Sequence, residues 1–457
     1  MQQKMGSLAG QWSRVPGPSQ PWVLATPDSL VSSPSPSPPA VRRPPSAPLR
    51  DPLPRGLSSH TTVFWGGYGG CLMYRTPSLV LLNSGELLAF TQCRQDVEAG
   101  KDRVTDRSPQ EIHLKRSKDH GRTWSLAKTL AFSADPERNR LHRAQTVYDV
   151  KTGTIFLFDN DVPTPSEEEH RDLLDGGVNA SVANCSVHIW RSDDDGVSWR
   201  TVVNTTASSQ MGAGLATGIQ LPNGRLVVPH KGCNYPTGGQ WDAPTSDSPA
   251  SSPAFVGAHS LWSDDHGATW VAGDPTPPTV AGYPATECQV APLANGSLLM
   301  MARSVQPKLG RVPSIAWQTG QKPDCPGCQD PLGASLGWLN RVSSVSNDEG
   351  RTWSVPRVEP SLAGYASCHG SLFRHKESVY FSFPENPRRA NLTIRRSSDN
   401  GDSWPADAAH ELTVHQGPSA YSSLGATALG ELAVLWEAWP DMMFATTKYF
   451  DGFEEAH

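Results

Sequence analysis

The sequence contains no long hydrophobic run and little net charge, and each absence excludes a class of protein. A membrane-spanning helix needs about 20 consecutive apolar residues, and no stretch approaches that length. We therefore expect no transmembrane segment, which leaves a protein that is soluble or attached peripherally to a membrane. The net charge of -6 gives no reason to expect nucleic acid as the partner.

The first 60 residues lack the aliphatic side chains that a folded core requires. Thirteen of the 41 prolines fall there, and such a composition cannot bury enough surface to offset the entropy of ordering. We predict a disordered Pro/Ser-rich segment over residues 1–60 and a folded domain over residues 61–457. The segment also lacks the continuous apolar stretch of a secretory signal peptide, which favours a cytoplasmic location.

The eight cysteines are scattered and form no strong pattern of metal ligands. One CPGC stretch, residues 325–328, has no second pair at ligand spacing, so a turn disulfide or two free thiols is favoured over zinc. Sequons for N-glycosylation favour the secretory route over the cytoplasmic location that the missing signal peptide favours. Five are present, at Asn179, Asn184, Asn204, Asn295 and Asn391.

What the sequence does contain is one turn motif in five copies, each of which we call an Asp box. The copies are SKDHGRTW (117–124), SDDDGVSW (192–199), SDDHGATW (263–270), SNDEGRTW (346–353) and SSDNGDSW (397–404). Each follows a run with alternating apolar residues that is typical of a β-strand. The Asp side chain can accept backbone N–H bonds, the Gly supplies a positive φ, and the Trp can pack against the next strand. We predict structural staples with no chemical role.

The spacing of the Asp boxes predicts the architecture. Their serines are separated by 75, 71, 83 and 51 residues, and hairpins at such intervals that cannot each bury a face alone indicate stacked or radial repetition. With four strands and long loops per unit, residues 61–457 would form about six blades. We predict an all-β fold, a six-bladed β-propeller.

Five further segments occur in an order that resembles the sialidases, the exo-α-sialidase or neuraminidase family. They are YRTPSLVLLNSGELLAFTQCR (74–94), GIQLPNGRLVVP (218–229), ATECQVAPLANGSLLMMARS (285–304), NLTIRRSSDNGDSW (391–404) and GPSAYSSL (417–424). The last two look most similar to lysosomal-type animal sialidases. The resemblance covers nearly all of residues 61–457 and implies a sialidase-type propeller that acts on sialic acid.

The resemblance implies three arginines that bind the carboxylate of sialic acid. This group stays ionised, so a dry pocket needs fixed positive charge with planar donors, which favours Arg over Lys. By motif match the three are Arg75, Arg303 and Arg389. Arg388 is adjacent to the third and stays an alternative, although the spacing to NLT favours Arg389.

The family also implies a tyrosine nucleophile, which sialidases use in place of the usual Asp or Glu. A second anion would be repelled by the substrate carboxylate, whereas a neutral phenol can approach. A phenol with a pKa near 10 needs a base beside it. Tyr421 in SAYSSL matches the nucleophile, and Glu287 in TECQV matches its partner.

A general acid/base is expected in the loop before the first Asp box. The family places an Asp eleven residues ahead of the box serine, which corresponds to Asp106 in VTDRSPQ. Asp96 and Asp102 share the loop and stay alternatives. Two supporting residues follow from the resemblance: Arg94 matches an arginine near the substrate, and Glu437 matches a glutamate that orients Arg75.

The resemblance thus implies a retaining exo-α-sialidase. Its expected partners are sialylated glycoproteins, glycolipids such as gangliosides, and oligosaccharides, and its chemistry requires no metal or other cofactor. Two alternatives remain: a trans-sialidase, in which an acceptor sugar replaces water, and a glycan-binding propeller without catalysis. The sequons and the lysosomal-type resemblance favour a lysosomal or secretory location over a cytoplasmic one.

Overall fold

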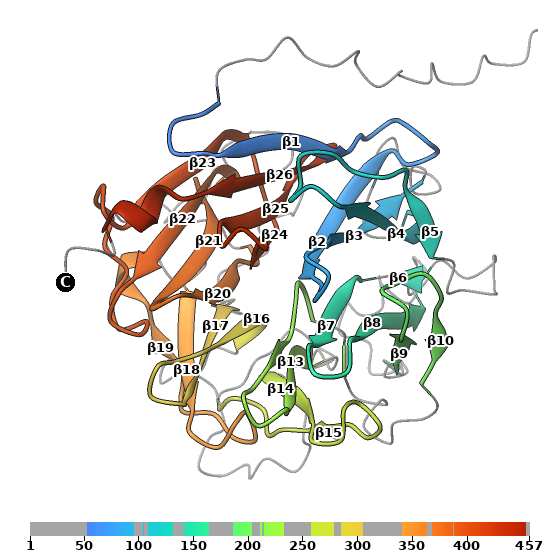
Figure 1. Cartoon of the computed structure of the whole chain (residues 1–457). Helices are drawn as coiled ribbons and strands as arrows, with labels where there is room; N and C mark the ends of the chain where they lie inside the picture. The colour runs from blue at the N-terminus through green and yellow to red at the C-terminus, as the bar shows by residue number, and fades with distance from the viewer. Residues whose placement is uncertain are drawn as a thin grey trace, which may run out of the picture. The chain divides into compact units, whose positions relative to one another are not determined.

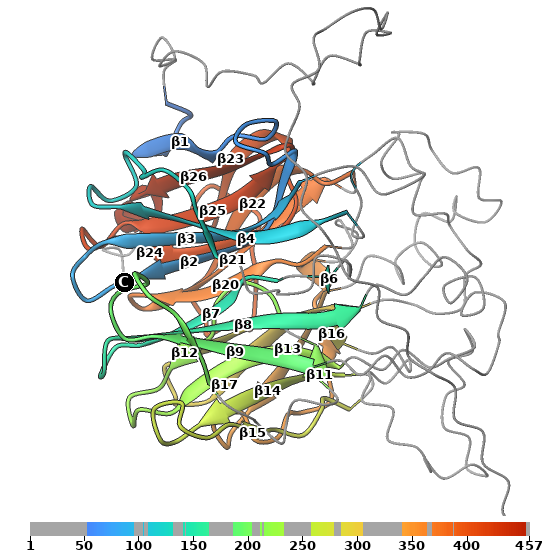
Figure 2. The same cartoon turned by 90° about the vertical axis from the view of Figure 1, so that its right-hand side faces the viewer.

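Six antiparallel β-sheets make up the described part of the chain and are arranged radially in a computed structural model (Figures 1 and 2). The structure describes residues 53–95, 104, 108–130, 140–141, 143–163, 186–202, 211–212, 214–232, 257–277, 285–304, 341–362, 368–386 and 388–453. All lie in one unit, Arg42–His457. Most of the segment predicted to be disordered, residues 1–60, is outside these ranges, so its disorder stays a prediction.

The first three blades follow one another along the chain. Blade I contains β2 (Met73–Leu81), β3 (Leu87–Arg94), β4 (Gln110–Ser117) and β5 (Lys128–Leu130). Blade II contains β7 (Gln145–Asp149), β8 (Thr154–Pro163), β9 (Ser186–Ser192) and β10 (Arg200–Thr201), with β6 (Arg140–Leu141) also paired to β8. Blade III contains β12 (Ile219–Gln220), β13 (Leu226–Gly232), β14 (Ala258–Ser263) and β15 (Val271–Ala272), with β11 (Met211–Gly212) also paired to β13.

The other three blades complete the ring. Blade IV contains β16 (Ala285–Pro292), β17 (Leu298–Ser304), β18 (Arg341–Ser346) and β19 (Arg357–Val358). Blade V contains β20 (Ser371–His375), β21 (Ser378–Asn386), β22 (Ala390–Ser397) and β23 (Glu411–Pro418). Blade VI contains β24 (Ser422–Ala426), β25 (Leu432–Ala438), β26 (Asp441–Thr447) and β1 (Ser59–Phe64). Two short 3₁₀ helices, η3 (Pro360–Leu362) and η4 (Tyr449–Phe453), follow β19 and β26.

The innermost strands contact one another around the ring, which confirms the predicted six-bladed propeller. Strand β2 contacts both β24 and β7, β7 contacts β12, and β20 contacts both β16 and β24. Blades III and IV meet through β13 and β16. The ring is closed by β1, which pairs antiparallel with β26, so that the first and last strands of the propeller share one sheet.

The core lies between the blades, and strand alternation supplies it. In β3, Leu87 and Ala89 pack with residues of blade VI, whereas Leu88 and Phe90 pack with residues of blade II. Side chains of successive strand residues point to opposite faces, and both faces of a blade are covered by its neighbours. The second strands therefore contain runs of consecutive apolar residues, such as LLAF in β3, IFLF in β8 and LLMMA in β17.

The Asp boxes connect the third strand to the fourth in blades I to V, and their turns have the predicted hydrogen bonds. In the first box, one oxygen of Asp119 accepts from the backbone N–H of Thr123 at 2.8 Å, and Ser117 Oγ accepts from the N–H of Gly121 at 2.8 Å. The other four boxes repeat this arrangement. Blade VI has no third-to-fourth turn because its outer strand is β1, which explains five boxes in six blades.

Each box also packs against the preceding blade. A Cβ added to Gly267 of the third box would lie 2.1 Å from the ring of Phe156 in blade II, and one added to Gly121 would lie 2.1 Å from Phe444 in blade VI. The box Trp270 makes an edge contact with Phe156, with ring centroids 5.4 Å apart. The boxes therefore staple neighbouring blades together in addition to closing their own hairpins.

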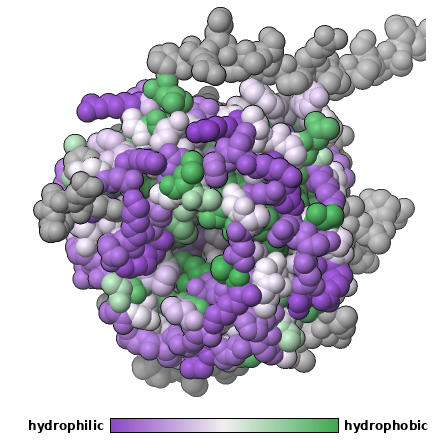
Figure 3. Space-filling view, in the orientation of Figure 1, coloured by the Kyte–Doolittle hydropathy of each residue, from purple (hydrophilic) through white to green (hydrophobic). Residues whose placement is uncertain are grey.

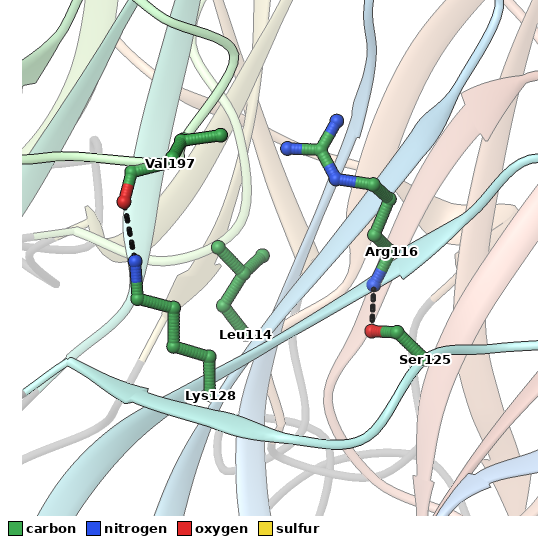
Figure 4. A pocket seen from close by; sticks show the side chains of 6 residues that line it. Leu114, Arg116, Ser125, Lys128 and Val197 are labelled. Atoms are coloured by element: carbon green, nitrogen blue, oxygen red, sulfur yellow. Dashed lines mark hydrogen bonds between the residues drawn. The ribbon is translucent and has the colours of Figure 1, made fainter.

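Strand direction separates the boxes from the predicted site residues. Neighbouring strands are antiparallel, so first strands begin and second strands end at one rim, which we call the site rim. The boxes follow third strands and lie at the opposite rim, the box rim. A pocket at the box rim between blades I and II is lined by Leu114, Arg116, Ser125, Lys128, Gly196 and Val197 (Figure 4). None of the predicted site residues lines it.

The surface in the view of Figure 1 is mostly hydrophilic, with scattered hydrophobic residues and a hollow near the centre of the ring (Figure 3). The described residues include no helix long and apolar enough to cross a membrane.

Candidate active site

The predicted site residues come from different blades but reach the same rim. Arg75 lies near the start of β2 and Glu287 near the start of β16, whereas Tyr421 directly precedes β24. These are the positions at which three innermost strands begin. Arg303 and Glu437 lie near the ends of the second strands β17 and β25. The topology therefore brings to one rim residues that are up to 362 positions apart in the sequence.

Tyr421, Glu287 and Arg303 form one hydrogen-bonded chain, in which the first two side chains are buried and Arg303 is partly exposed. The phenol of Tyr421 donates to Oε1 of Glu287 at 2.7 Å, and Nη1 of Arg303 donates to Oε2 of the same carboxylate at 3.0 Å. Tyr421 and Glu287 are each 8% exposed. The carboxylate is thus positioned to accept the phenol proton, and the guanidinium stabilises its charge.

Burial raises the pKa of Tyr421 well above its ordinary value, and the neighbouring Glu287 carboxylate adds to this shift. The phenol is therefore neutral when no ligand is bound. It needs a base to remove its proton before its oxygen can act as a nucleophile. The pKa of Arg303 is also raised: burial alone would lower it, but the negative charge of Glu287 outweighs burial. Arg303 consequently remains a fixed cation.

Glu437 holds Arg75 in place, as the resemblance implied. It is fully buried, and its Oε2 lies 2.8 Å from Nε of Arg75. The carboxylate also accepts from the backbone N–H of Thr76 at 2.7 Å and from the indole N–H of Trp439 at 3.0 Å. The guanidinium of Arg75 lies 5.1 Å from the ring centre of Trp439 and 5.4 Å from that of Tyr421. Arg75 is thereby fixed beside the phenol.

Arg389 approaches the same tyrosine from blade V. Its guanidinium lies 5.7 Å from the ring centre of Tyr421, and its carbonyl accepts from the backbone N–H of Ser419 at 2.8 Å. Arg389 occupies a turn between β21 and β22 with φ of 57°. Arg388 is exposed, so the geometry favours Arg389 as the third arginine of the cluster.

Arg94 occupies the end of β3 in blade I. It is 4% exposed, and its Nε donates to Oε1 of Gln92 at 2.9 Å. Gln92 therefore orients Arg94. Asp106 and its alternatives Asp96 and Asp102 lie outside the described residues, so the general acid/base stays a prediction.

Sequence reasoning missed several side chains at this rim. Trp439 hydrogen-bonds Glu437, and Cys368 packs against Tyr421. His369 lies beside the phenol ring, with ring centroids 5.6 Å apart. Arg143 precedes the innermost strand β7. No sequence motif marks these residues. Arg143 and His369 could have been predicted from their positions in the blades, because each lies two residues before an innermost strand.

A disulfide joins Cys71 to Cys93, next to the β2 and β3 residues of the site. Cys288 and Cys368 are free and buried, and burial raises the pKa of both thiols. Within the described ranges, no cluster of three or more His, Cys, Asp or Glu residues could hold a metal ion. The CPGC stretch lies outside these ranges.

Comparison with known proteins supports the resemblance. Residues 110–320 match the model of the BNR repeat-like domain. Sialidase-4 of Homo sapiens is 28% identical over 314 residues, which is 66% of this chain and 54% of that protein. The sialidase of Micromonospora viridifaciens is 25% identical over 413 residues, 86% of this chain and 55% of that protein. The chain thus spans a little more than half of these relatives.

Solved structures share the fold. The Hadza microbial sialidase Hz136 superposes with a TM-score of 0.59 at 22% identity, over 85% of this chain and 68% of that chain. A mutant of Trypanosoma rangeli sialidase displaying trans-sialidase activity gives a TM-score of 0.56 at 15% identity, over 88% and 61%. The chain is thus similar in sequence to the BNR repeat-like domain and to sialidases, and it shares its fold with solved sialidase structures.

Proposed function

We propose that the protein is a retaining exo-α-sialidase that hydrolyses terminal sialic acid from glycoproteins, glycolipids and oligosaccharides. The observation that carries this proposal is the 2.7 Å hydrogen bond from Tyr421 to Glu287, with Arg303 on the other carboxylate oxygen. A binding module could use the arginines alone. It would have no need of a phenol whose proton is already directed to a buried carboxylate.

Substrate binding would rest on Arg75, Arg303 and Arg389. The three come from blades I, IV and V. Arg75 and Arg389 lie within 6 Å of the ring centre of Tyr421, at 5.4 Å and 5.7 Å, and Arg303 reaches it through Glu287. Guanidinium groups bind carboxylates with two parallel hydrogen bonds. Holding the substrate carboxylate there would present the adjoining anomeric carbon to the phenol.

In the first half-reaction, Oη of Tyr421 forms a bond to the anomeric carbon while the glycosidic carbon–oxygen bond breaks. Glu287 takes the phenol proton, and Asp106 gives a proton to the leaving oxygen. In the second half, water attacks the same carbon and loses a proton to Asp106. The phenol leaves and recovers its proton from Glu287. Two inversions retain the configuration.

The test is Tyr421→Phe, assayed on a fluorogenic aryl sialoside. We expect kcat to fall by about a thousandfold or more, because the attacking oxygen is removed. Tyr148→Phe is the matched control, since Tyr148 lies near the end of β7 at the box rim, where its hydroxyl accepts from the backbone N–H of Asn83 at 3.2 Å. Unchanged turnover by folded Tyr421→Phe protein would refute the tyrosyl mechanism.

The same assay separates the alternative functions. Adding lactose as an acceptor would give sialyllactose in place of free sialic acid if the protein is a trans-sialidase. A glycan-binding propeller would bind the sialoside without releasing the fluorophore. Either result would replace hydrolysis as the function.

We also propose a lysosomal or secretory location. The disulfide Cys71–Cys93 supports it, since disulfides persist in oxidising compartments. The sequon residue Asn295 is exposed in the turn between β16 and β17. Sensitivity of the cellular protein to a glycosidase that removes N-glycans would support the proposal, whereas insensitivity together with a cytosolic distribution would contradict it.

A further inference from the structure

One exposed aromatic ring lies at the site rim. Tyr68 is 41% exposed, and in the described ranges it is the one aromatic residue among the exposed large hydrophobic residues. It belongs to the connection from β1 to β2, residues 65–72 (WGGYGGCL), which we call the glycine loop. Strand β1 is antiparallel to β26, a third strand that starts at the site rim, so β1 ends there. The glycine loop therefore lies on the same rim as Arg75 and Tyr421.

The glycine loop presents the Tyr68 ring with few side chains around it. Gly67, Gly69 and Gly70 have positive φ of 75°, 66° and 85°, and a Cβ added to any of them would meet nothing within 4 Å. The backbone N–H of Gly67 donates to the carbonyl of Cys71 at 2.7 Å, and the N–H of Cys71 donates to the carbonyl of Tyr68 at 3.3 Å. The glycines thus allow a closed turn whose tip carries a single ring.

The start of the glycine loop is fixed to residues that position Arg75. The backbone N–H of Gly66 donates to Oδ1 of Asp441 at 2.7 Å, and a Cβ added to Gly66 would lie 2.5 Å from Cβ of Pro440. Pro440 follows Trp439, whose ring centre lies 5.1 Å from the guanidinium of Arg75. The first half of the loop therefore packs on the turn that supports this arginine.

The end of the glycine loop is fixed beside Arg94. The disulfide joins Cys71 to Cys93, and the backbone N–H of Leu72 donates to the carbonyl of Arg94 at 2.8 Å. A loop held at both ends loses little conformational freedom when a ligand binds to it. Tyr68 is therefore presented next to the candidate site on a preorganised support.

The position of Tyr68 suits the part of a glycan that stays outside the reaction centre. Tyr421 and Glu287 are each 8% exposed, so the reacting sugar must enter the ring of blades, while the rest of the glycan extends outward past the rim. The glycine loop contains no charged residue, so it is suited to a neutral ligand. The C–H groups on one face of a pyranose carry partial positive charge and match the negative face of an aromatic ring.

We propose that Tyr68 binds the neutral sugar to which the terminal sialic acid is attached. The glycine loop then forms the leaving-group side of the site, and it makes oligosaccharides better substrates than sialosides with a small leaving group. This inference rests on the proposed sialidase function. It adds a substrate contact from the connection between blades VI and I, separate from the groups that hold or attack the sialic acid.

The test compares the wild type, Tyr68→Ala and Tyr68→Phe on sialyllactose and on methyl α-sialoside, with release of sialic acid as the measurement. For Tyr68→Ala we expect KM for sialyllactose to rise about three- to tenfold, the effect of losing one aromatic contact. On methyl α-sialoside, which has no second sugar, kcat/KM should stay unchanged. Tyr68→Phe keeps the ring and should match the wild type on both substrates.

Two controls separate loss of the contact from damage to the site. Free sialic acid has no leaving group, so its inhibition constant should be the same for the wild type and Tyr68→Ala. Leu429→Ala removes a side chain that is 50% exposed in the turn between β24 and β25, at the box rim. Its kinetics should match the wild type on both substrates.

The outcomes distinguish this inference from the function on which it rests. Wild-type protein that cleaves neither substrate contradicts the proposed sialidase activity itself. With an active wild type, three results would overturn the role of Tyr68: no loss on sialyllactose, an equal loss on both substrates, or weaker inhibition by sialic acid. A loss in Tyr68→Phe as large as in Tyr68→Ala would assign the contact to the hydroxyl and overturn binding by the ring.

Discussion

At the scale of single residues, the site is a set of charges held by buried partners. Glu437 accepts three hydrogen bonds or ion-pair contacts, from Arg75, Thr76 and Trp439. Each donor comes from the site rim, and the carboxylate itself is fully buried. A guanidinium fixed in this way does not have to be ordered when a ligand binds, which is the basis of preorganised recognition. Under the proposed function, Glu437 would act on the substrate through Arg75.

Glu437→Gln tests this positioning role. Breaking a buried charge pair leaves Arg75 without its counter-charge and costs about 2–5 kcal/mol, so we expect kcat/KM on the aryl sialoside to fall about a hundredfold, with most of the change in KM. Glu377→Gln is the control, because Glu377 is 93% exposed and pairs with Arg374 only at 3.5 Å. A Glu437→Gln protein that is less stable but has an unchanged KM would show a purely structural role.

At the scale of elements, the Asp box is a joint between blades. Its Gly has a positive φ, and in the third box this glycine also contacts the buried ring of Phe156. The hydrogen bonds of the turn come from Ser263 and Asp265 of the same box. One short motif therefore fixes both the hairpin and the distance to the preceding blade.

Gly267→Ala should be more destabilising than Gly296→Ala. Both glycines have positive φ, 79° and 86°, but an added Cβ meets Phe156 at 2.1 Å in the first case and nothing within 4 Å in the second. Backbone strain is common to both, so the difference measures overpacking at the blade interface, about 1–3 kcal/mol. Urea unfolding of the two variants checks this. Equal losses would mean that the interface relaxes around the methyl group, and KM should stay unchanged in both.

At the scale of the whole molecule, some features could be predicted from the sequence and others could not. The boxes, the alternating strands and the length of residues 61–457 predicted about six blades, because five of the six blades carry a box as a local signal. Ring closure by β1 has no such signal: Ser59 pairs with Thr446, 387 residues away. Ordered motifs predicted Tyr421, Glu287 and the arginines as site residues, and the fold brings them to one rim. No motif pointed to Arg143 or His369, whose place at this rim depends on the register of the blades. Asp106 still rests on the motif alone.

The stability of the whole propeller should fall in acid because buried histidines are neutral in the folded state. Burial lowers the pKa of His259 to about 4, despite a contact between Nδ1 and the Gly257 carbonyl at 3.3 Å. In the unfolded chain the pKa returns to about 6.5. Between these values only the unfolded chain binds the proton, so the free energy of unfolding decreases as pH falls, by about 1.4 kcal/mol per pH unit. His369 acts in the same direction.

His259→Gln tests this account by urea unfolding at pH 7 and pH 5. Between these values the wild type should lose about 2 kcal/mol through His259 alone, and the variant should lose that much less. The sign follows from the direction of the shift: a histidine with a lowered pKa contributes nothing above its unfolded pKa and opposes folding below it. If both proteins lose the same stability, His259 is protonated without cost, and the acid sensitivity of the ring must come from other groups.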